Sequence, residues 1–130
     1  MTLNDYQKKA MTTCMYSCYN FSYMFINLVG EVGEFASKIA KAMRKEDAEI
    51  RTEMNLRGEY EYQNDLLCND DVKVDEIKKE AGDILWQLSG LCEVMGWELE
   101  DVAQMNLDKL AARKKAGTID GNGDGILRSK

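Results

Sequence analysis

The fold is decided by residues 21–44, FSYMFINLVGEVGEFASKIAKAMR. Apolar side chains recur there every three or four positions, which places them on one side of an α-helix. The residues that make this stripe are Phe21, Phe25, Leu28, Val32, Phe35, Ile39 and Met43. The spacing predicts a long amphipathic helix from Phe21 to Arg44 that packs its apolar side against other elements.

Three further helices are predicted around this one. The first runs from about Asn4 to Tyr19. The next runs from about Asp75 to Met95, where Gly96 is a plausible C-terminal stop, and the last runs from about Glu98 to Ala116 and ends at Gly117. No alternating strand pattern of convincing length interrupts them. The sequence therefore predicts an all-α class, a helical bundle of about four main helices.

The chain divides into one domain and a tail. Residues 1–117 form the predicted domain. Within it, residues 45–74 are a polar insertion that holds at most a short helix near Asp47 to Leu56. Residues 118–130 are glycine-rich and too poor in apolar residues to pack alone. Residues 120–125, DGNGDG, open like a calcium loop, but the acid that such a loop needs at its twelfth position is missing from the sequence. We expect a flexible tail.

Composition narrows the classes of function. The chain has 17 basic and 23 acidic side chains, a formal charge of -6, which argues against binding a nucleic-acid polymer. Ala10 to Gly30 is uncharged, but threonine, serine, asparagine and tyrosine interrupt it, so we expect no membrane span. Four cysteines without a C-x-x-C spacing, and no histidine, predict free thiols, no zinc site and a cytoplasmic protein.

Two carboxylate couples stand on the predicted helices, Glu31-x-x-Glu34 and Glu80-x-x-Asp83. Residues three apart share a helix face, so two such helices side by side bring four carboxylates together. Hard oxygen ligands of this kind suit Mg²⁺ or Mn²⁺. Solvated helix flanks would give the same pattern without an ion, but clustered like charges are easier to explain when a cation neutralises them.

Glycines lie close to these acids. Gly30 and Gly33 bracket Glu31, and Gly82 precedes Asp83. Each costs about 1 kcal/mol relative to alanine in a helix interior. Either another backbone or a ligand approaches them closely, or the helices pack tightly there.

Several other side chains are candidates for contacts with a ligand or a partner. Asn106, Lys109 and Arg113 fall within the apolar stripe of the last helix, where they either snorkel over the edge of the core or line a pocket. Trp86 lies opposite the stripe of its own helix, which predicts an exposed indole covered by a second subunit or by a stacked base. A bundle in which one apolar stripe faces inward and another faces a copy of the chain is completed by oligomerisation.

Three blocks of the sequence resemble the MazG-like nucleoside triphosphate pyrophosphohydrolases of the all-α NTP pyrophosphatase superfamily. They are GEVGEFASK at 30–38, EAGDILW at 80–86 and NLDKLAAR at 106–113. The resemblance implies that Mg²⁺ is bound by Glu31, Glu34, Glu80 and Asp83, and that the nucleotide is contacted by Lys38, Trp86, Asn106, Lys109 and Arg113. The 45 residues between Glu34 and Glu80 are more than this family usually has.

The resemblance also implies an activity. Water activated by the metal would attack the α-phosphate of a (d)NTP and give (d)NMP and pyrophosphate, in a homo-oligomer of two or four chains. Two rival functions stay open. One is a non-catalytic nucleotide-binding module, and the other is a helical protein-interaction module whose acids are merely solvated.

Overall fold

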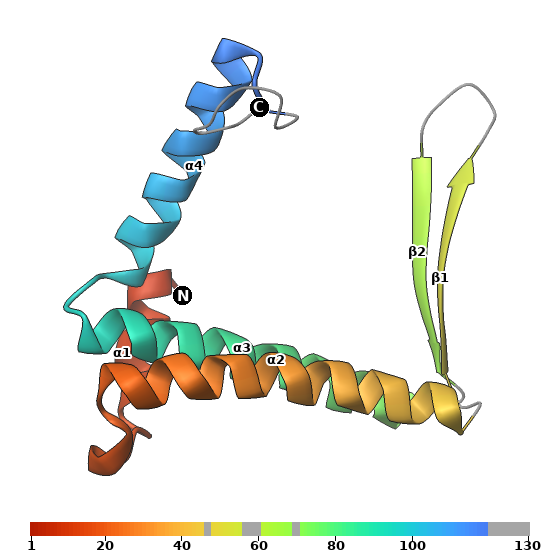
Figure 1. Cartoon of the computed structure of the whole chain (residues 1–130), viewed down its shortest axis with the longest axis horizontal. Coiled ribbons are helices and arrows are strands. Elements are labelled where there is room, and N and C mark those ends of the chain that lie inside the picture. The colour runs from red at the N-terminus through yellow and green to blue at the C-terminus, as the bar shows by residue number, and fades with distance from the viewer. Residues whose placement is uncertain (46–47, 56–60, 69–70, 120–130) are drawn as a thin grey trace. The chain divides into compact units, whose positions relative to one another are not determined.

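A computed structural model describes residues 1–45, 48–55, 61–68 and 71–119, and the side chains of all of these except 48, 51–55, 61–68 and 71–73. The elements follow in the order α1 (Leu3–Met11), a 3-10 helix (Tyr16–Cys18), α2 (Phe21–Arg44), β1 (Ala48–Asn55), β2 (Glu61–Cys68), α3 (Asp71–Val94) and α4 (Leu99–Ala116) (Figure 1). They form two compact units. The central unit is Ser22–Leu88, and the terminal unit is Met1–Phe21 with Ser89–Lys130.

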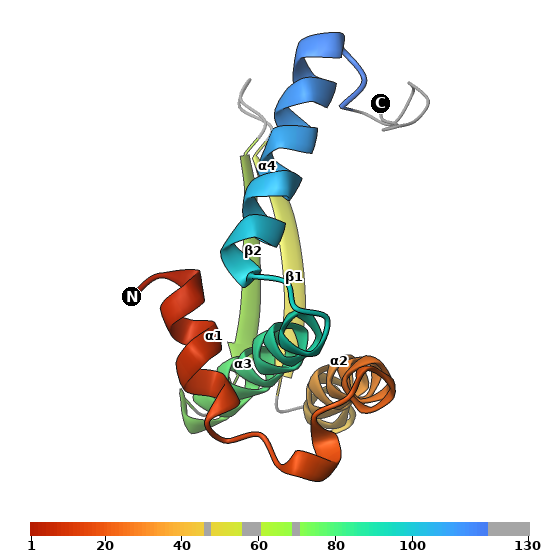
Figure 2. The same cartoon turned by 90° about the vertical axis from the view of Figure 1, so that its left-hand side faces the viewer.

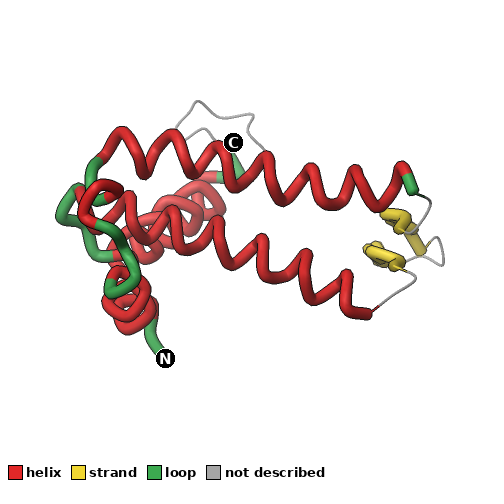
Figure 3. Tube along the Cα trace, turned by 90° about the horizontal axis from the view of Figure 1, so that it is seen from below, coloured by secondary structure: helices red, strands yellow, loops and turns green. Residues whose placement is uncertain are grey.

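Helices α2 and α3 build the central unit. They run antiparallel and side by side (Figures 1 and 3). Side chains join them at two places along the pair, Asn27 with Gln87 and Lys38 with Glu80. The prediction for α2, Phe21 to Arg44, is confirmed to the residue. The predicted all-α class with four main helices is also confirmed.

The connection between α2 and α3 holds a β-hairpin, so the predicted short helix near Asp47 to Leu56 is wrong. Strands β1 and β2 pair antiparallel, from Ala48 opposite Cys68 to Asn55 opposite Glu61. The strand has a local cause in its sequence. Ile50, Thr52 and Met54 alternate with Glu49, Arg51 and Glu53, and this period of two belongs to a strand rather than a helix.

The first helix is shorter than the predicted span of Asn4 to Tyr19. Helix α1 begins after Thr2, which forms a capping box with Asp5, and it ends at Met11. The next two residues explain the end. The hydroxyls of Thr12 and Thr13 donate to the carbonyl oxygens of Lys9 and Ala10 at 2.6 and 2.7 Å, and such local bonds compete with helical ones.

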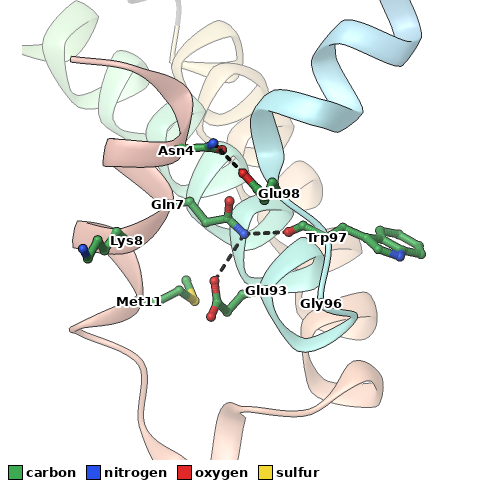
Figure 4. Close-up of a pocket in the computed structure, with 8 residues that line it drawn as sticks. All are labelled: Asn4, Gln7, Lys8, Met11, Glu93, Gly96, Trp97 and Glu98. Carbon is green, nitrogen blue, oxygen red and sulfur yellow. Dashed lines mark hydrogen bonds between the residues drawn. The ribbon is translucent and has the colours of Figure 1, made fainter.

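In the terminal unit, α1 (Figure 2) is hydrogen-bonded to the turn between α3 and α4 (Figure 4). Gln7 is 6 % exposed, donates to Glu93 and to the carbonyl oxygen of Trp97, and accepts from the amide of Leu99. Asn4 donates to Glu98 and accepts from the amide of Glu100. Because the N-cap residue Glu98 makes no side-chain cap, α1 supplies the acceptors that the first turn of α4 needs.

Glycines end the two later helices, as predicted. Gly96 and Gly117 both have φ of 75°, a left-handed conformation that glycine adopts without strain. After Gly96 the amide of Trp97 donates to the carbonyl oxygen of Cys92 at 2.8 Å. The calcium-like sequence at 120–125 lies outside the described residues.

The apolar core within a single chain is small. Among the described side chains, the buried apolar ones are Met24, Ile77, Cys92 and Leu99. The predicted stripe of α2 is only partly covered, since Phe25 and Val32 are 51 % and 50 % exposed. The described side chains of one chain therefore leave much of the long apolar face of α2 exposed.

Two further expectations concern the membrane and the thiols. No helix in the described ranges is long and apolar enough to cross a membrane. Cys14, Cys18 and Cys92 are free thiols, whereas the side chain of Cys68, the fourth predicted free thiol, lies outside the described part of the chain. Burial raises the pKa of the Cys92 thiol above its usual range, which keeps it protonated and unreactive.

Candidate metal centre

Three carboxylates meet where α2 faces α3. Glu31 comes from α2, and Glu80 and Asp83 come from one face of α3, three residues apart. One oxygen atom of each lies within 4.8 Å of the others. The fourth predicted ligand, Glu34, is exposed and is not part of this group of three.

The spacing and chemistry of these oxygens fit a small divalent cation. Ligand oxygens around Mg²⁺ stand at about 2.1 Å from the ion, so opposite ones are about 4.2 Å apart. The oxygens of the three carboxylates, which lie within 4.8 Å of one another, are spaced about as widely as such ligands. Glu31 is half-buried, the Glu80 side chain is 12 % exposed and Asp83 is exposed, so the group is open on one side. An ion held there would keep positions for water or substrate.

The local electrostatics also favour a cation. Partial burial raises the pKa of the Glu31 carboxyl, and the charges of Asp83, Glu80 and Glu34 raise it further. A hydrogen bond from Asn27 acts in the opposite direction. Keeping Glu31 ionised therefore costs free energy in the metal-free chain, and a bound cation would offset that cost.

Lys38 places a positive charge of the chain itself at this site. Its ammonium lies 2.9 Å from a carboxylate oxygen of Glu80. That hydrogen bond and the charge of Glu80 raise the pKa of Lys38, and the charges of Glu76 and Glu34 add to the effect. Lys38 is thus positively charged at neutral pH and neutralises part of the acid cluster.

A buried amide network lies beside the acids, and the sequence did not single it out. Gln87 is 1 % exposed and bonds both Met24 and Asn27, and Asn27 in turn reaches Glu31. Gln87 stands three residues after Ile84 and four before Leu91, where the apolar stripe of α3 would carry an apolar residue. A polar residue at a core position was the signal that could have revealed it.

The remaining predicted contact residues are not gathered at the acids. Trp86 is half-buried, whereas the sequence predicted an exposed indole. Asn106 and Lys109 are exposed and Arg113 is half-buried on α4. Because α4 belongs to the terminal unit, their contact with substrate stays a prediction.

The terminal unit has a cleft of its own, of about 400 Å³, lined in part by Asn4, Gln7, Glu93, Trp97 and Glu98 (Figure 4). Most of its polar groups bond one another across the joint between α1 and the start of α4. The cleft is therefore explained as the seam of that joint, and it contains none of the predicted site residues.

Comparison with known proteins identifies a family for this chain. The model of one family, the MazG nucleotide pyrophosphohydrolase domain, matches residues 20–118. The match begins before α2, ends after α4 and includes all four predicted acids, whereas α1 precedes it. The "Gene 37 protein" of Mycobacterium phage L5 is 32 % identical over 131 residues, which cover 95 % of this chain and 98 % of that protein. No solved structure matches.

Proposed function

The chain belongs to the MazG nucleotide pyrophosphohydrolase domain family, and from that premise we propose that it is a Mg²⁺-dependent hydrolase of nucleoside triphosphates. The products are the monophosphate and pyrophosphate. The observation that carries the proposal is the meeting of Glu31, Glu80 and Asp83, whose oxygens lie within 4.8 Å of one another.

The three carboxylates are the proposed ligands of the ion, with Glu34 as the predicted fourth. Bound there, Mg²⁺, or Mn²⁺ in its place, would make water a better nucleophile and offset negative charge on the triphosphate. No histidine is available in the sequence as a general base. An acid of this cluster would accept the proton of the attacking water.

Lys38 has two roles in this proposal. In the metal-free chain its ammonium pairs with Glu80. If Glu80 served as a ligand, the ammonium would be released and could neutralise the departing pyrophosphate. Asn106, Lys109 and Arg113 on α4 remain the proposed contacts of the nucleotide, and Trp86 a proposed contact of its base.

A second copy of the chain is the proposed cover of the α2 face. Large apolar side chains along α2 are about half exposed or more, among them Phe25, Ile26, Val29 and Val32. An apolar face of this kind is costly in water and typical of a subunit interface. The assembly is therefore proposed to be a homo-oligomer, a dimer or a tetramer.

The test is product analysis. The purified protein is incubated with each common ribo- and deoxyribonucleoside triphosphate in Mg²⁺ or in EDTA, and the products are separated by anion-exchange chromatography. Monophosphate and pyrophosphate that form only with metal support the proposal. Diphosphate and phosphate would contradict it, and Mg²⁺-dependent binding without products would favour the non-catalytic nucleotide-binding module.

A matched pair of variants ties the activity to the acids. Glu80→Gln removes one charge from the cluster and should abolish most turnover. Glu76→Gln removes a charge from an exposed residue one turn earlier on α3, outside the group of three, and should leave turnover near that of the wild type. Equal activity in all three folded proteins would contradict the assignment of the metal centre.

A further inference from the structure

Gln87 is a fully buried amide at the contact between α2 and α3, in the turn of α3 that follows Asp83. Its side chain is 1 % exposed, and the Met24 side chain against which it packs is 0 % exposed. A buried side-chain amide destabilises the folded protein unless both its oxygen and its nitrogen form hydrogen bonds. The orientation of Gln87 is therefore set by the groups around it.

Met24 decides that orientation. The Nε2 of Gln87 lies 3.4 Å from the carbonyl oxygen and 3.1 Å from the Sδ of Met24. A carbonyl oxygen and a thioether sulfur only accept hydrogen bonds, so the nitrogen of Gln87 must face them. The oxygen of Gln87 then has to face Asn27.

The orientation of Asn27 follows from that of Gln87. The Nδ2 of Asn27 donates to the Oε1 of Gln87 at 2.7 Å. Because a side-chain amide has one NH₂ group, the same nitrogen also faces Glu31, whose Oε1 it reaches at 3.4 Å. The opposite orientation would place the Asn27 oxygen against the Glu31 carboxylate, and two acceptors repel each other.

We propose that Asn27 and Gln87 are positioning residues that hold Glu31 ready for the metal, an inference that rests on the proposed function. Met24 and Gln87 commit the Asn27 amide to donate toward Glu31. The contact of 3.4 Å is long beside the usual range of about 2.7–3.2 Å, so it directs the carboxylate and leaves it room to move onto an ion. Partners of metal ligands commonly have this role.

The test measures Mn²⁺ binding by the full-length chain, using electron paramagnetic resonance of the free ion. Asn27→Leu keeps the approximate volume and removes the donor. Its matched control is Gln104→Leu on α4, because Gln104 also donates to an acid four residues ahead, Asp108, at 2.9 Å. The proposed relay, in which Gln87 orients Asn27 and Asn27 orients Glu31, predicts about tenfold weaker Mn²⁺ binding for Asn27→Leu and unchanged binding for Gln104→Leu.

A second variant separates positioning from folding. Gln87→Met leaves Asn27 in place but removes the group that fixes its orientation, so Mn²⁺ binding should weaken severalfold. Since both substitutions act through the same contact with Glu31, the double variant should bind Mn²⁺ no more weakly than Asn27→Leu alone. A purely structural role would lower the melting temperature and leave the Kd for Mn²⁺ unchanged.

The outcomes distinguish this inference from the proposed function. If the wild type binds Mn²⁺ and the folded Asn27→Leu and Gln87→Met variants bind it equally well, the relay is refuted and the metal centre stands. Additive losses in the double variant would also refute the relay. If the wild type binds no Mn²⁺, the metal centre itself is refuted, and the relay with it.

Discussion

Gly82 offers a prediction in which stability and function can be read separately. It lies inside α3, next to the proposed ligand Asp83, and a β-carbon built on it meets no described atom within 4 Å. Replacing Gly82 by alanine therefore introduces no clash within the described part of the chain. It also removes the conformational freedom that glycine gives the unfolded chain.

The expected gain follows from helix propensity. A glycine in a helix interior costs about 1 kcal/mol relative to alanine. For a domain of this size that corresponds to a rise of about 4 °C in melting temperature. Ala81→Gly is the matched control, since Ala81 is the exposed neighbour in the same helix, and it should lower the melting temperature by a similar amount.

Thermal unfolding followed by circular dichroism, in EDTA and at two protein concentrations, measures both shifts. Turnover with Mg²⁺ is measured on the same samples. A folded Gly82→Ala protein that is less stable than the wild type would refute this reasoning. It would mean that a second subunit or another part of the chain occupies the space beside Gly82. Higher stability with lost turnover would instead show that substrate needs that space.

Three other perturbations test separate parts of the structure. Lys38→Met should tighten Mn²⁺ binding roughly two- to fivefold, because the exposed Lys38–Glu80 salt bridge no longer has to break when the ion binds. Turnover should fall in the same variant. Weaker Mn²⁺ binding would show that Lys38 does not compete with the ion for Glu80. The folded-state pKa of Glu31 is raised above its usual 4.5, so its contribution to stability is complete below that pH and is lost as pH rises through the raised value. Without metal, the wild type should therefore lose more stability than Glu31→Gln between pH 4.5 and neutrality. A parallel pH dependence of the denaturant midpoints of the two proteins would contradict this. Gln7→Leu leaves buried partners unpaired and should cost about 1–3 kcal/mol in chemical denaturation, whereas an unchanged midpoint would show that α1 is not needed to start α4.

Helices α2, α3 and α4, and the grouping of three of the four predicted acids, could be predicted because their signals are long or local. The α2 stripe repeats over the whole helix, so both of its ends could be placed. The i,i+3 spacing of Glu80 and Asp83 puts them on one face of α3 whatever surrounds it. Their meeting with Glu31 required only that the two helices pack side by side.

Other features depend on information that a short pattern does not carry. The alternation around Ile50 is brief and rich in charge, so its strand was missed. The pair of threonines at 12 and 13 ended α1 through bonds to carbonyl oxygens that are visible only in three dimensions. Gln87 gains its role from Met24 and Asn27, which lie more than 55 residues away in the sequence. Such long-range pairings cannot be read from one helix alone.

The most direct test of the account is hydrolysis of a nucleoside triphosphate substrate in ¹⁸O-labelled water with Mg²⁺, followed by mass spectrometry of both products. Attack of water on the α-phosphorus predicts one ¹⁸O atom in the monophosphate, none in the pyrophosphate, and no reaction in EDTA or with Glu80→Gln. Label in the pyrophosphate would place the attack on the β-phosphorus. Labelled monophosphate formed at the same rate in EDTA would contradict the metal centre on which the account rests.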